Sequence, residues 1–395
     1  MAESQWPDFD WGCVLPGQRQ NRGLMNILFF NSIGTTTWGG GEKWMFLAAR
    51  GLRDKGHRVY VGGRVDSLFL RTFREMEFET LPLHITGDFG LINILKIRRF
   101  LLARGIDAVV ANFNKDIRLT GIAGRLANRP AIIARSGALI LRNNWRYRLS
   151  YRKLVDGILT NSLSIKKRYT SYPFIENQFV RVIYNGIDPH TETEYHGPFP
   201  GADFGMPDHR PVIGNFGRLV KVKQPLMFLE VAHRIKEDYP EALFLMVGDG
   251  PMRNEILSYA AQLGLTENLY LPGFQEAVFK FYSMCDLVLL TSEHEGQPNV
   301  IMEAMLAGKP VISFDVGGVS ELIHSEETGI RVAPNDIYRM GEMALELLAD
   351  EPRRLAIGEA ARRFISRNFS VGVMVEKVEE YLLEVVRRRR PDFSG

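Results

Sequence analysis

The stretch from residue 287 to residue 310 reads LVLLTSEHEGQPNVIMEAMLAGKP: a short apolar run, a loop and a segment of helical length. The run Leu287–Leu290 is typical of a buried strand. Pro298 stands near the first turn of the expected helix, and Gly308 followed by Pro310 marks its end. The amino end of this helix therefore opens at the top of a strand, where unpaired N–H groups and the helix dipole favour a phosphate.

Two glutamates belong to this stretch. Glu295 lies in the loop before the helix, and Glu303 lies more than a turn inside it. A carboxylate accepts two hydrogen bonds at once, so each can hold a vicinal diol of a ribose or a sugar ring. The alternative is that Glu295 is a loop charge and Glu303 faces solvent. We favour the binding interpretation because the apolar residues after Glu303 indicate a buried setting, in which an unpartnered carboxylate is costly.

A second strand runs into a glycine loop that carries cations, GNFGRLVKVK at residues 214–223. Arg218, as a planar fork, and Lys223, as a point charge, are suited to clamp a diphosphate. The alternative is an ordinary basic surface loop.

Two further glycine turns follow in the same half. The sequence VGDGP places Gly248 and Gly250 where a strand turns into a helix and backbone can approach a ligand closely. The sequence LPGF ends the next strand with Gly273 and Phe274, which could present backbone groups and a ring to a nucleotide base.

Short apolar runs alternate with segments of helical length along the whole chain. The predicted strands are residues 25–30, 58–62, 79–83, 108–112, 130–135, 157–160, 180–184, 212–216, 242–247, 268–271, 287–290 and 311–314. Such alternation implies parallel sheets with crossover helices. We predict an α/β protein of two Rossmann-like domains that face each other across a cleft, with ligands at the carboxyl ends of the strands.

The predicted domains are residues 25–195 and 211–370, joined by a linker at 196–210 that is rich in proline and glycine. Residues 1–24 are polar and aperiodic, and we expect a disordered extension. Residues 371–395 contain a helix with an apolar face that needs a partner to pack against. That face consists of Met374, Val378, Tyr381 and Val385.

Composition excludes several classes of protein. Among 395 residues, 45% are hydrophobic and 24% charged, as in ordinary soluble proteins. The net charge of +3 is too small for a protein that wraps nucleic acid, so we expect no nucleic-acid partner. Two cysteines, Cys13 and Cys285, cannot staple a chain of this size and fit a reducing compartment. The sequence has neither a membrane-spanning apolar run nor a signal peptide, so we expect a cytoplasmic location.

The motifs resemble a known family. GRLVKVK, VGDGP, LPGF, EGQPNVIMEAMLAGKPVI and DVGGVSEL follow one another as in the nucleotide-sugar half of retaining glycosyltransferases of the GT-B fold, and more narrowly in glycosyltransferase family 4. This resemblance covers residues 211–333. In the first half, WGGGE and GHRV resemble the family's first loop and second strand, and VIYNGID is similar to its sequence before the interdomain crossover.

The resemblance implies a retaining transfer of a sugar from a nucleoside diphosphate, UDP ahead of GDP, to a hydroxyl of a glycan or glycolipid. The product would belong to cell-envelope polysaccharide or lipopolysaccharide. Residues 25–195 would bind the acceptor, residues 211–370 the donor, and the final helix would cross back onto the first domain.

The resemblance also implies roles for individual residues. Glu303 would bind the ribose hydroxyls, Glu295 would contact the transferred sugar, and Arg218 and Lys223 would bind the diphosphate. The other donor-binding positions would be Gly40, Gly41, Gly248, Gly250, Gly273, Phe274, Asn299 and Val300.

The chain departs from the family in two places. Gln297 stands where phenylalanine is frequent. A histidine that commonly follows one strand of the first domain is missing, and Arg135 and Ser136 stand there instead. We therefore take Arg135, Ser136 and Asn185 as candidates for contacts with the sugar or the acceptor.

We expect no metal and no other cofactor, because cations and a helix end can neutralise the leaving group. The Asp-x-Asp sequence at Asp8 and Asp10 lies in the extension, away from any strand end. His294 is too crowded by Glu293 and Glu295 to make a convincing ligand set.

Three other functions stay open. A nicotinamide dehydrogenase would also contain Rossmann-like halves, but no G-x-G-x-x-G sequence follows a predicted strand. A non-catalytic nucleotide-sugar sensor would share the fold, and the presence together of Glu295, Glu303, Arg218 and Lys223 argues against decay of the site. A nucleotide-sugar epimerase would release free sugar or epimerised donor without an acceptor.

Residues 142–153, RNNWRYRLSYRK, combine five cations with three aromatic residues and contain no acid. The aromatic residues are Trp145, Tyr147 and Tyr151. The segment is typical of an interfacial helix on an anionic membrane surface. The alternative is a solvated helix whose aromatic residues pack inward.

Overall fold

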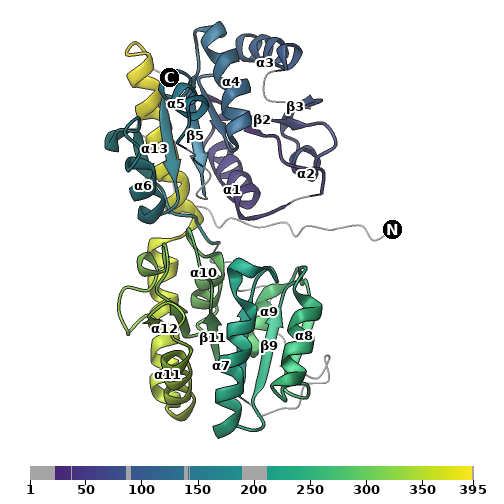
Figure 1. The fold of residues 1–395 in the computed structure, drawn as a ribbon. Coiled ribbons are helices and arrows are strands. Elements are labelled where there is room, and N and C mark those ends of the chain that lie inside the picture. The colour runs from purple at the N-terminus through teal and green to yellow at the C-terminus, as the bar shows by residue number, and fades with distance from the viewer. Residues whose placement is uncertain are drawn as a thin grey trace.

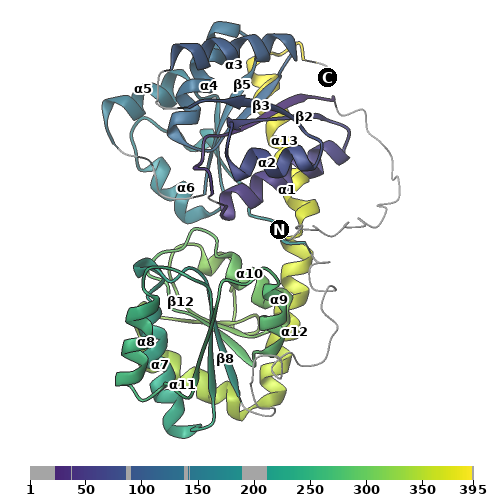
Figure 2. The same cartoon turned by 90° about the vertical axis from the view of Figure 1, so that its right-hand side faces the viewer.

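A computed structural model describes residues 23–36, 38–85, 90–137, 141, 143–188 and 211–393. The protein consists of two α/β lobes (Figures 1 and 2). The N-lobe is formed by residues 23–188 together with the last helix, and the C-lobe by residues 211–368. The predicted linker at 196–210, residues 1–22 of the predicted extension and Cys13 lie outside the described residues.

The N-lobe contains a parallel seven-stranded sheet in the order β3-β2-β1-β4-β5-β6-β7. Its elements are β1 (Asn26–Asn31), α1 (Gly40–Asp54), β2 (Arg58–Arg64), α2 (Leu68–Glu75), β3 (Glu79–Leu83), α3 (Leu91–Ala103), β4 (Ala108–Ala111), α4 (Asn114–Ala127), β5 (Ala131–Ser136), α5 (Trp145–Lys153), β6 (Gly157–Thr160), α6 (Leu163–Thr170) and β7 (Val180–Val182).

The C-lobe contains a parallel six-stranded sheet in the order β10-β9-β8-β11-β12-β13. Its elements are β8 (Val212–Phe216), α7 (Pro225–Asp238), β9 (Leu243–Val247), α8 (Arg253–Gln262), β10 (Leu269–Gly273), α9 (Val278–Met284), β11 (Leu287–Leu290), α10 (Asn299–Leu306), β12 (Val311–Phe314), β13 (Ile330–Val332), α11 (Ile337–Ala349) and α12 (Glu351–Asn368). The last helix, α13 (Val371–Arg389), returns to the N-lobe.

The predicted fold class is confirmed, and each predicted strand overlaps an observed one. Strand β13 was not predicted. In each sheet the strand order reverses direction beside the first strand, between β1 and β4 and between β8 and β11. Ligands of such sheets bind at this switch point, beyond the carboxyl ends of the strands.

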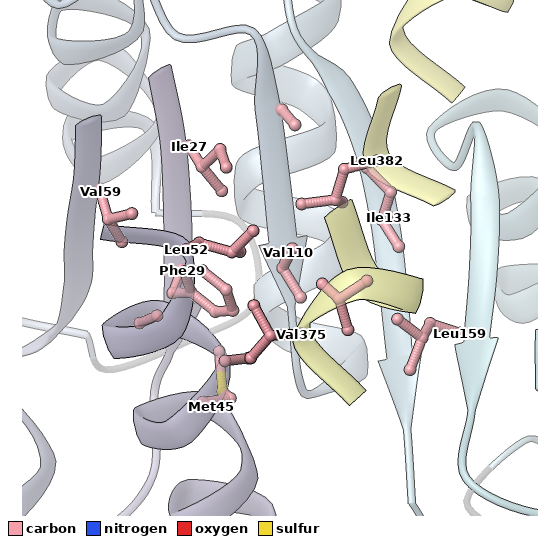
Figure 3. Close-up of a cluster of buried hydrophobic side chains, with 14 of the residues drawn as sticks. Ile27, Phe29, Met45, Leu52, Val59, Val110, Ile133, Leu159, Val375 and Leu382 are labelled. Carbon is pink, nitrogen blue, oxygen red and sulfur yellow. The ribbon is translucent and has the colours of Figure 1, made fainter. Parts of the chain in front are cut away.

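Helix α13 completes the core of the N-lobe. Figure 3 shows Val375 and Leu382 of this helix among the buried side chains of Phe29, Val110 and Ile133 from the sheet. Helix α1 packs closely against it, because a Cβ on Gly51 would lie 2.4 Å from a methyl group of Val375. The last helix in the sequence is therefore a structural part of the first lobe.

The two chain crossings between the lobes lie side by side. The amide of Ile187 donates to the carbonyl of Phe369 (2.8 Å), and the amide of Val371 donates to the carbonyl of Ile187 (3.1 Å). A Cβ on Gly186 would lie 2.6 Å from the Cα of Val371, so this crossing has no room for a side chain.

A buried ionic group fastens α13 to the N-lobe. The amide of Met25 donates to Nδ1 of His57 (3.1 Å), which leaves the Nε2 proton for the carboxylate of Glu379 (3.0 Å). Lys55 pairs with the other oxygen of that carboxylate at 2.7 Å. Burial alone would raise the pKa of Glu379, but the hydrogen bonds from His57 and Lys55 outweigh it and lower the pKa to about 2.

We predict that Glu379→Ala lowers the free energy of unfolding by about 3 kcal/mol near neutral pH, because it breaks a buried charged pair. Glu384→Ala on the same helix removes two half-exposed ion pairs, with Arg181 and Arg388, and is the control, with a loss below about 1 kcal/mol.

The pKa of Glu379 lies below its ordinary value of 4.5. Its stabilising effect is therefore complete above that pH and disappears as the pH falls toward about 2. Urea unfolding of both proteins at about pH 7 and about pH 2.5 measures the difference. A loss for Glu379→Ala that is the same at both pH values would contradict the assignment.

Candidate active site

A pocket lies between the lobes, at the carboxyl ends of strands from both sheets. Gly40, Lys43 and Trp44 of α1 line it on one side, and Asn299 and Glu303 of α10 on the other. Helix α10 begins after the loop that follows β11, with Pro298 as its N-cap. The free N–H groups of its first turn, at Asn299 and Val300, therefore belong to the same region as Glu303.

The carboxylate of Glu303 has a partner on each oxygen. The hydroxyl of the buried Tyr282 donates to one oxygen (3.2 Å), and the ammonium of Lys43 lies 3.3 Å from the other. Burial, reinforced by the nearby charge of Glu303, raises the pKa of Tyr282 well above its usual value and keeps it a hydrogen-bond donor. Glu303 is 14% exposed and thus faces the pocket rather than open solvent.

Glu295 forms an ion pair with Lys223, whose ammonium lies 2.5 Å from one carboxylate oxygen. The lysine belongs to a short 3-10 turn, Lys221–Lys223, that follows the basic loop after β8. The structure therefore brings together two residues that the sequence placed 72 positions apart. Arg218 lies on the same loop and is exposed.

Three glycine turns of the C-lobe pack backbone to backbone. A Cβ on Gly248 would lie 1.8 Å from the carbonyl oxygen of Gly217, and a Cβ on Gly250 would lie 2.4 Å from that of Leu219. The amide of Gly248 donates to the carbonyl of Gly273 (2.9 Å). From the sequence we expected the backbone at Gly248 and Gly250 to approach a ligand closely. In the structure it lies against the backbone of the neighbouring loop. Phe274, after the third turn, is 73% exposed.

The loop of Glu295 is held in the same way. A Cβ on Gly317 would lie 1.8 Å from the carbonyl oxygen of Glu295, and a Cβ on Gly318 would lie 1.9 Å from that of Gly296. The two glycines of DVGGVSEL therefore act as a support for this loop.

Gln297 links the interlobe crossing to α10. Its buried side-chain oxygen accepts a hydrogen bond from the amide of Asn185 (2.5 Å), and the side chain of Asn185 donates to Asn299 (3.1 Å). Gln297, which stands where phenylalanine is frequent in the family, thus has a polar partner on the other side of the cleft. Sequence reasoning missed this link because nothing local indicates that residues 185 and 297 meet.

A second polar link crosses between the lobes. Glu321 accepts hydrogen bonds from the amides of Leu163 (2.7 Å) and Ser164 (3.4 Å), the first residues of α6. A carboxylate is favoured at this position by the helix dipole. Sequence reasoning did not single out Glu321, although it belongs to the quoted motif DVGGVSEL.

The N-lobe wall of the cleft contains buried polar residues. Glu42 accepts from Asn31 (2.8 Å) and from the amide of Gly39 (3.0 Å), which fixes the start of α1. Arg135 lies beside this group, and its guanidinium donates to Asn112 (3.2 Å). The hydroxyl of Ser136 instead accepts from Tyr169 (2.7 Å) and is buried.

Within the described ranges, no three side chains of His, Cys, Asp or Glu gather as a metal-binding group. His294 is exposed, and Asp8 and Asp10 lie outside those ranges. Cys285 is a buried free thiol whose pKa burial raises to about 12.

Two family models match the chain, one in each lobe. The Glycosyltransferase Family 4 model matches residues 38–191, and the Glycosyl transferases group 1 model matches residues 202–364. The chain belongs to glycosyltransferase family 4. The family predicted from the sequence motifs is thereby confirmed.

Several characterised proteins are similar to this glycosyltransferase family member. N-acetyl-alpha-D-glucosaminyl L-malate synthase of Bacillus anthracis is 28% identical over 211 residues, 53% of this chain and 55% of the relative. The Vi polysaccharide biosynthesis protein VipC/TviE of Salmonella typhi is 28% identical over 235 residues, 56% of this chain and 40% of the relative. The chain thus spans about half the length of these relatives. An Escherichia coli protein, UDP-Gal:alpha-D-GlcNAc-diphosphoundecaprenol alpha-1,3-galactosyltransferase, is 24% identical over 78% of this chain and 83% of its own length.

Solved structures show the same fold. A glycosyltransferase from Rickettsia africae superposes with a TM-score of 0.82, 18% identity and coverage of 92% of this chain and 99% of the other. HepE of Anabaena, solved in complex with UDP, superposes with a TM-score of 0.80, 22% identity and coverage of 91% and 100%. The chain has the GT-B fold.

We predict that Gly317→Ala displaces the Glu295 loop. Gly317 has φ +55, and its new Cβ would meet the carbonyl oxygen of Glu295. Gly264→Ala is the matched control, because Gly264 has φ +67 with nothing within 4 Å. Both variants lose about 1 kcal/mol of unfolding free energy, because alanine is strained in the left-handed conformation. Gly317→Ala should lose more than this because of the clash, and it should speed amide hydrogen exchange in residues 293–299. Equal exchange in the two variants would contradict the supporting role.

Proposed function

We propose that the protein is a retaining glycosyltransferase that moves a sugar from a nucleoside diphosphate to a hydroxyl of a glycan or glycolipid. The carrying observation is the position of Glu303 in a pocket that both lobes line, together with the Glu295–Lys223 pair on the loops that precede α10. This arrangement offers a carboxylate for ribose hydroxyls, a second for the sugar, and a cation with helix N–H groups for a diphosphate.

The proposed reaction breaks the bond between the sugar's anomeric carbon and the phosphate oxygen. The acceptor oxygen forms its new bond to that carbon on the same face, and the acceptor's proton passes to the leaving phosphate. Lys223, Arg218 and the first turn of α10 stabilise the charge that develops on the diphosphate, so the reaction needs no metal. Closure of the lobes excludes water, which would otherwise compete as acceptor.

UDP is the proposed nucleotide, ahead of GDP. HepE is solved with UDP and with UDP-glucose, and the Escherichia coli relative carries UDP-Gal in its name. The acceptor named for that relative is a sugar on diphosphoundecaprenol, which supports a glycolipid acceptor in envelope polysaccharide or lipopolysaccharide synthesis for this chain.

We predict that Glu303→Ala abolishes stabilisation by UDP in a thermal unfolding experiment carried out in EDTA. A ligand at about 100 times its Kd adds about 2.7 kcal/mol to the stability of the wild type. Glu293→Ala, at an exposed glutamate of the loop before α10, is the control and keeps the effect. Glu295→Ala should lose turnover more than nucleotide affinity.

The same experiment with GDP, ADP and NAD separates the alternatives. Stabilisation by NAD alone would favour a dehydrogenase. Equal stabilisation of wild type and Glu303→Ala by UDP would refute the ribose assignment. UDP binding together with release of free sugar or epimerised donor, and with no transfer to any acceptor, would favour the epimerase.

We also propose that the N-lobe contacts an anionic membrane surface. Trp145 and Leu149 are exposed one turn apart on α5, at 69% and 55%, among exposed arginines. Helix α3 exposes Leu91, Ile92 and Leu95 beside cations. Helices α3, α4 and α5 cover the same side of the N-lobe, and their single acid, Asp116, is buried (Figure 2).

The structure corrects the aromatic part of this prediction. Tyr151 is buried, and its hydroxyl donates to Asn114 (3.3 Å). Tyr147 is half-buried and accepts from the same asparagine (3.4 Å). Both pack inward, as in the alternative interpretation, so Trp145 is the one aromatic residue of the segment that faces outward. Residue 142 of this segment lies outside the described ranges. Within those ranges, no helix is long and apolar enough to cross a bilayer.

We predict that Trp145→Ala combined with Leu149→Ala reduces co-sedimentation with vesicles that contain phosphatidylglycerol, because it removes apolar area that would enter the interface. Leu163→Ala, at an equally exposed leucine on α6, is the control and leaves binding unchanged. Co-sedimentation of the double variant at the wild-type level would exclude this surface.

A further inference from the structure

Arg135 lies one residue before the end of β5, at the wall of the cleft, and most of its hydrogen-bonding capacity is unused. Its side chain is 5% exposed, and its guanidinium stacks over the ring of Trp44 at 4.9 Å. One nitrogen donates to Asn112 (3.2 Å). A guanidinium has five N–H donors, and in the described part of the chain no carboxylate forms an ion pair with it. Among the described residues, no nitrogen of Arg135 is a buried atom without a partner, so the N–H groups that do not bond Asn112 are open to solvent or to a ligand.

Glu42 is the nearest source of negative charge, but it serves other groups. Its oxygens accept from Asn31, from the amide of Gly39 and, at 3.5 Å, from Asn112. Asn112 thus stands between the carboxylate and the guanidinium. Burial lowers the pKa of Arg135 to about 10 while the charge of Glu42 opposes that shift, so the side chain stays cationic near neutral pH.

Two glycines keep the guanidinium uncovered. A Cβ on Gly41 would lie 3.1 Å from one of its nitrogens, and a Cβ on Gly137 would lie 3.0 Å from two of them. The carbonyl oxygen of Gly137 lies 3.0 Å from the position of a Cβ on Gly296, next to Glu295. The guanidinium therefore lies directly across the cleft from the loop assigned to the transferred sugar.

We propose that Arg135 binds a carboxylate on the sugar that occupies the cleft, so that one substrate of this protein is an acidic sugar such as a uronic acid. A planar carboxylate matches the two-pronged donor face of arginine. When the lobes close on a neutral sugar, the guanidinium would lose its remaining water without gaining a counter-charge. Lys223, Arg218 and α10 of the C-lobe are assigned to the diphosphate, and Lys43 of the N-lobe lies beside Glu303. Arg135 is therefore left for the sugar. This inference rests on the proposed function.

The test is titration calorimetry with two pairs of probes. UDP-glucuronate is compared with UDP-glucose, which places the carboxylate on the donor. Methyl glucuronoside is compared with methyl glucoside in the presence of UDP, which places it on the acceptor. In one of the two pairs, the wild type should bind the acidic probe about tenfold more tightly, the effect of one charged pair of hydrogen bonds.

Variants then assign the preference to the side chain. Arg135→Gln should reduce it to less than about twofold and leave the affinity for UDP unchanged, because the diphosphate is bound elsewhere. Arg135→Lys, which keeps the charge without the planar fork, should fall between the two. Arg99→Gln removes an exposed arginine of the same lobe and should keep the full preference.

Three results would overturn the proposal. Equal affinity for acidic and neutral probes in both pairs rules out the acidic sugar and leaves the glycosyltransferase assignment standing; this comparison needs only the wild type. An equal loss of UDP and UDP-glucuronate binding in a folded Arg135→Gln would assign the arginine to the diphosphate. A wild type that binds none of UDP, GDP and ADP would remove the proposed function and this inference with it.

Discussion

The geometry of the site depends on how closely backbones can approach one another at the top of the C-lobe sheet. Four glycines lie with their Cα against the carbonyl oxygens of neighbouring loops: Gly248, Gly250, Gly317 and Gly318. A Cβ at any of them would lie between 1.8 and 2.4 Å from such an oxygen, far inside van der Waals contact. The loops therefore lie in direct backbone contact, with no room for a side chain between them. Lys223 and Glu295 meet because their two loops are held in this way, and not because one side chain reaches across open solvent.

The relation between the lobes depends on the chain crossing twice at one place. The crossings at Ile187 and Ser370 pair as a short parallel bridge, and α13 then enters the N-lobe core. Away from this bridge, polar contacts such as those of Gln297, Glu321 and Lys43 join the lobes. Because α13 closes the N-lobe core by itself, separating the lobes at these polar contacts would leave that core covered, as expected of lobes that close about a hinge.

The fold could be predicted from the sequence because each parallel strand is a short apolar run between recognisable turns. The position of Glu303 could be predicted because a proline and a glycine mark the two ends of its helix. It was not sufficient for residues whose role depends on contacts between distant segments. Gln297 meets Asn185 across 112 positions, and Glu321 meets Leu163 across 158. In α5, the alternation of cations and aromatic residues does not indicate which way each ring points. Two of the three aromatic rings, those of Tyr147 and Tyr151, turn inward.

The carboxylates of the cleft are already paired, and this bears on how a donor would enter. Glu303 forms an ion pair with Lys43 of the other lobe, and Glu295 forms one with Lys223 of its own lobe. Lys43 is half-exposed, so its pair with Glu303 contributes little and ribose hydroxyls would displace it at small cost. Released, its ammonium would remain at the mouth of the pocket beside Gly40, on the side where a diphosphate would lie. The Lys223–Glu295 pair is more buried and less easily exchanged. A ligand that binds here would therefore rearrange the N-lobe side of the site first and leave the C-lobe side in place.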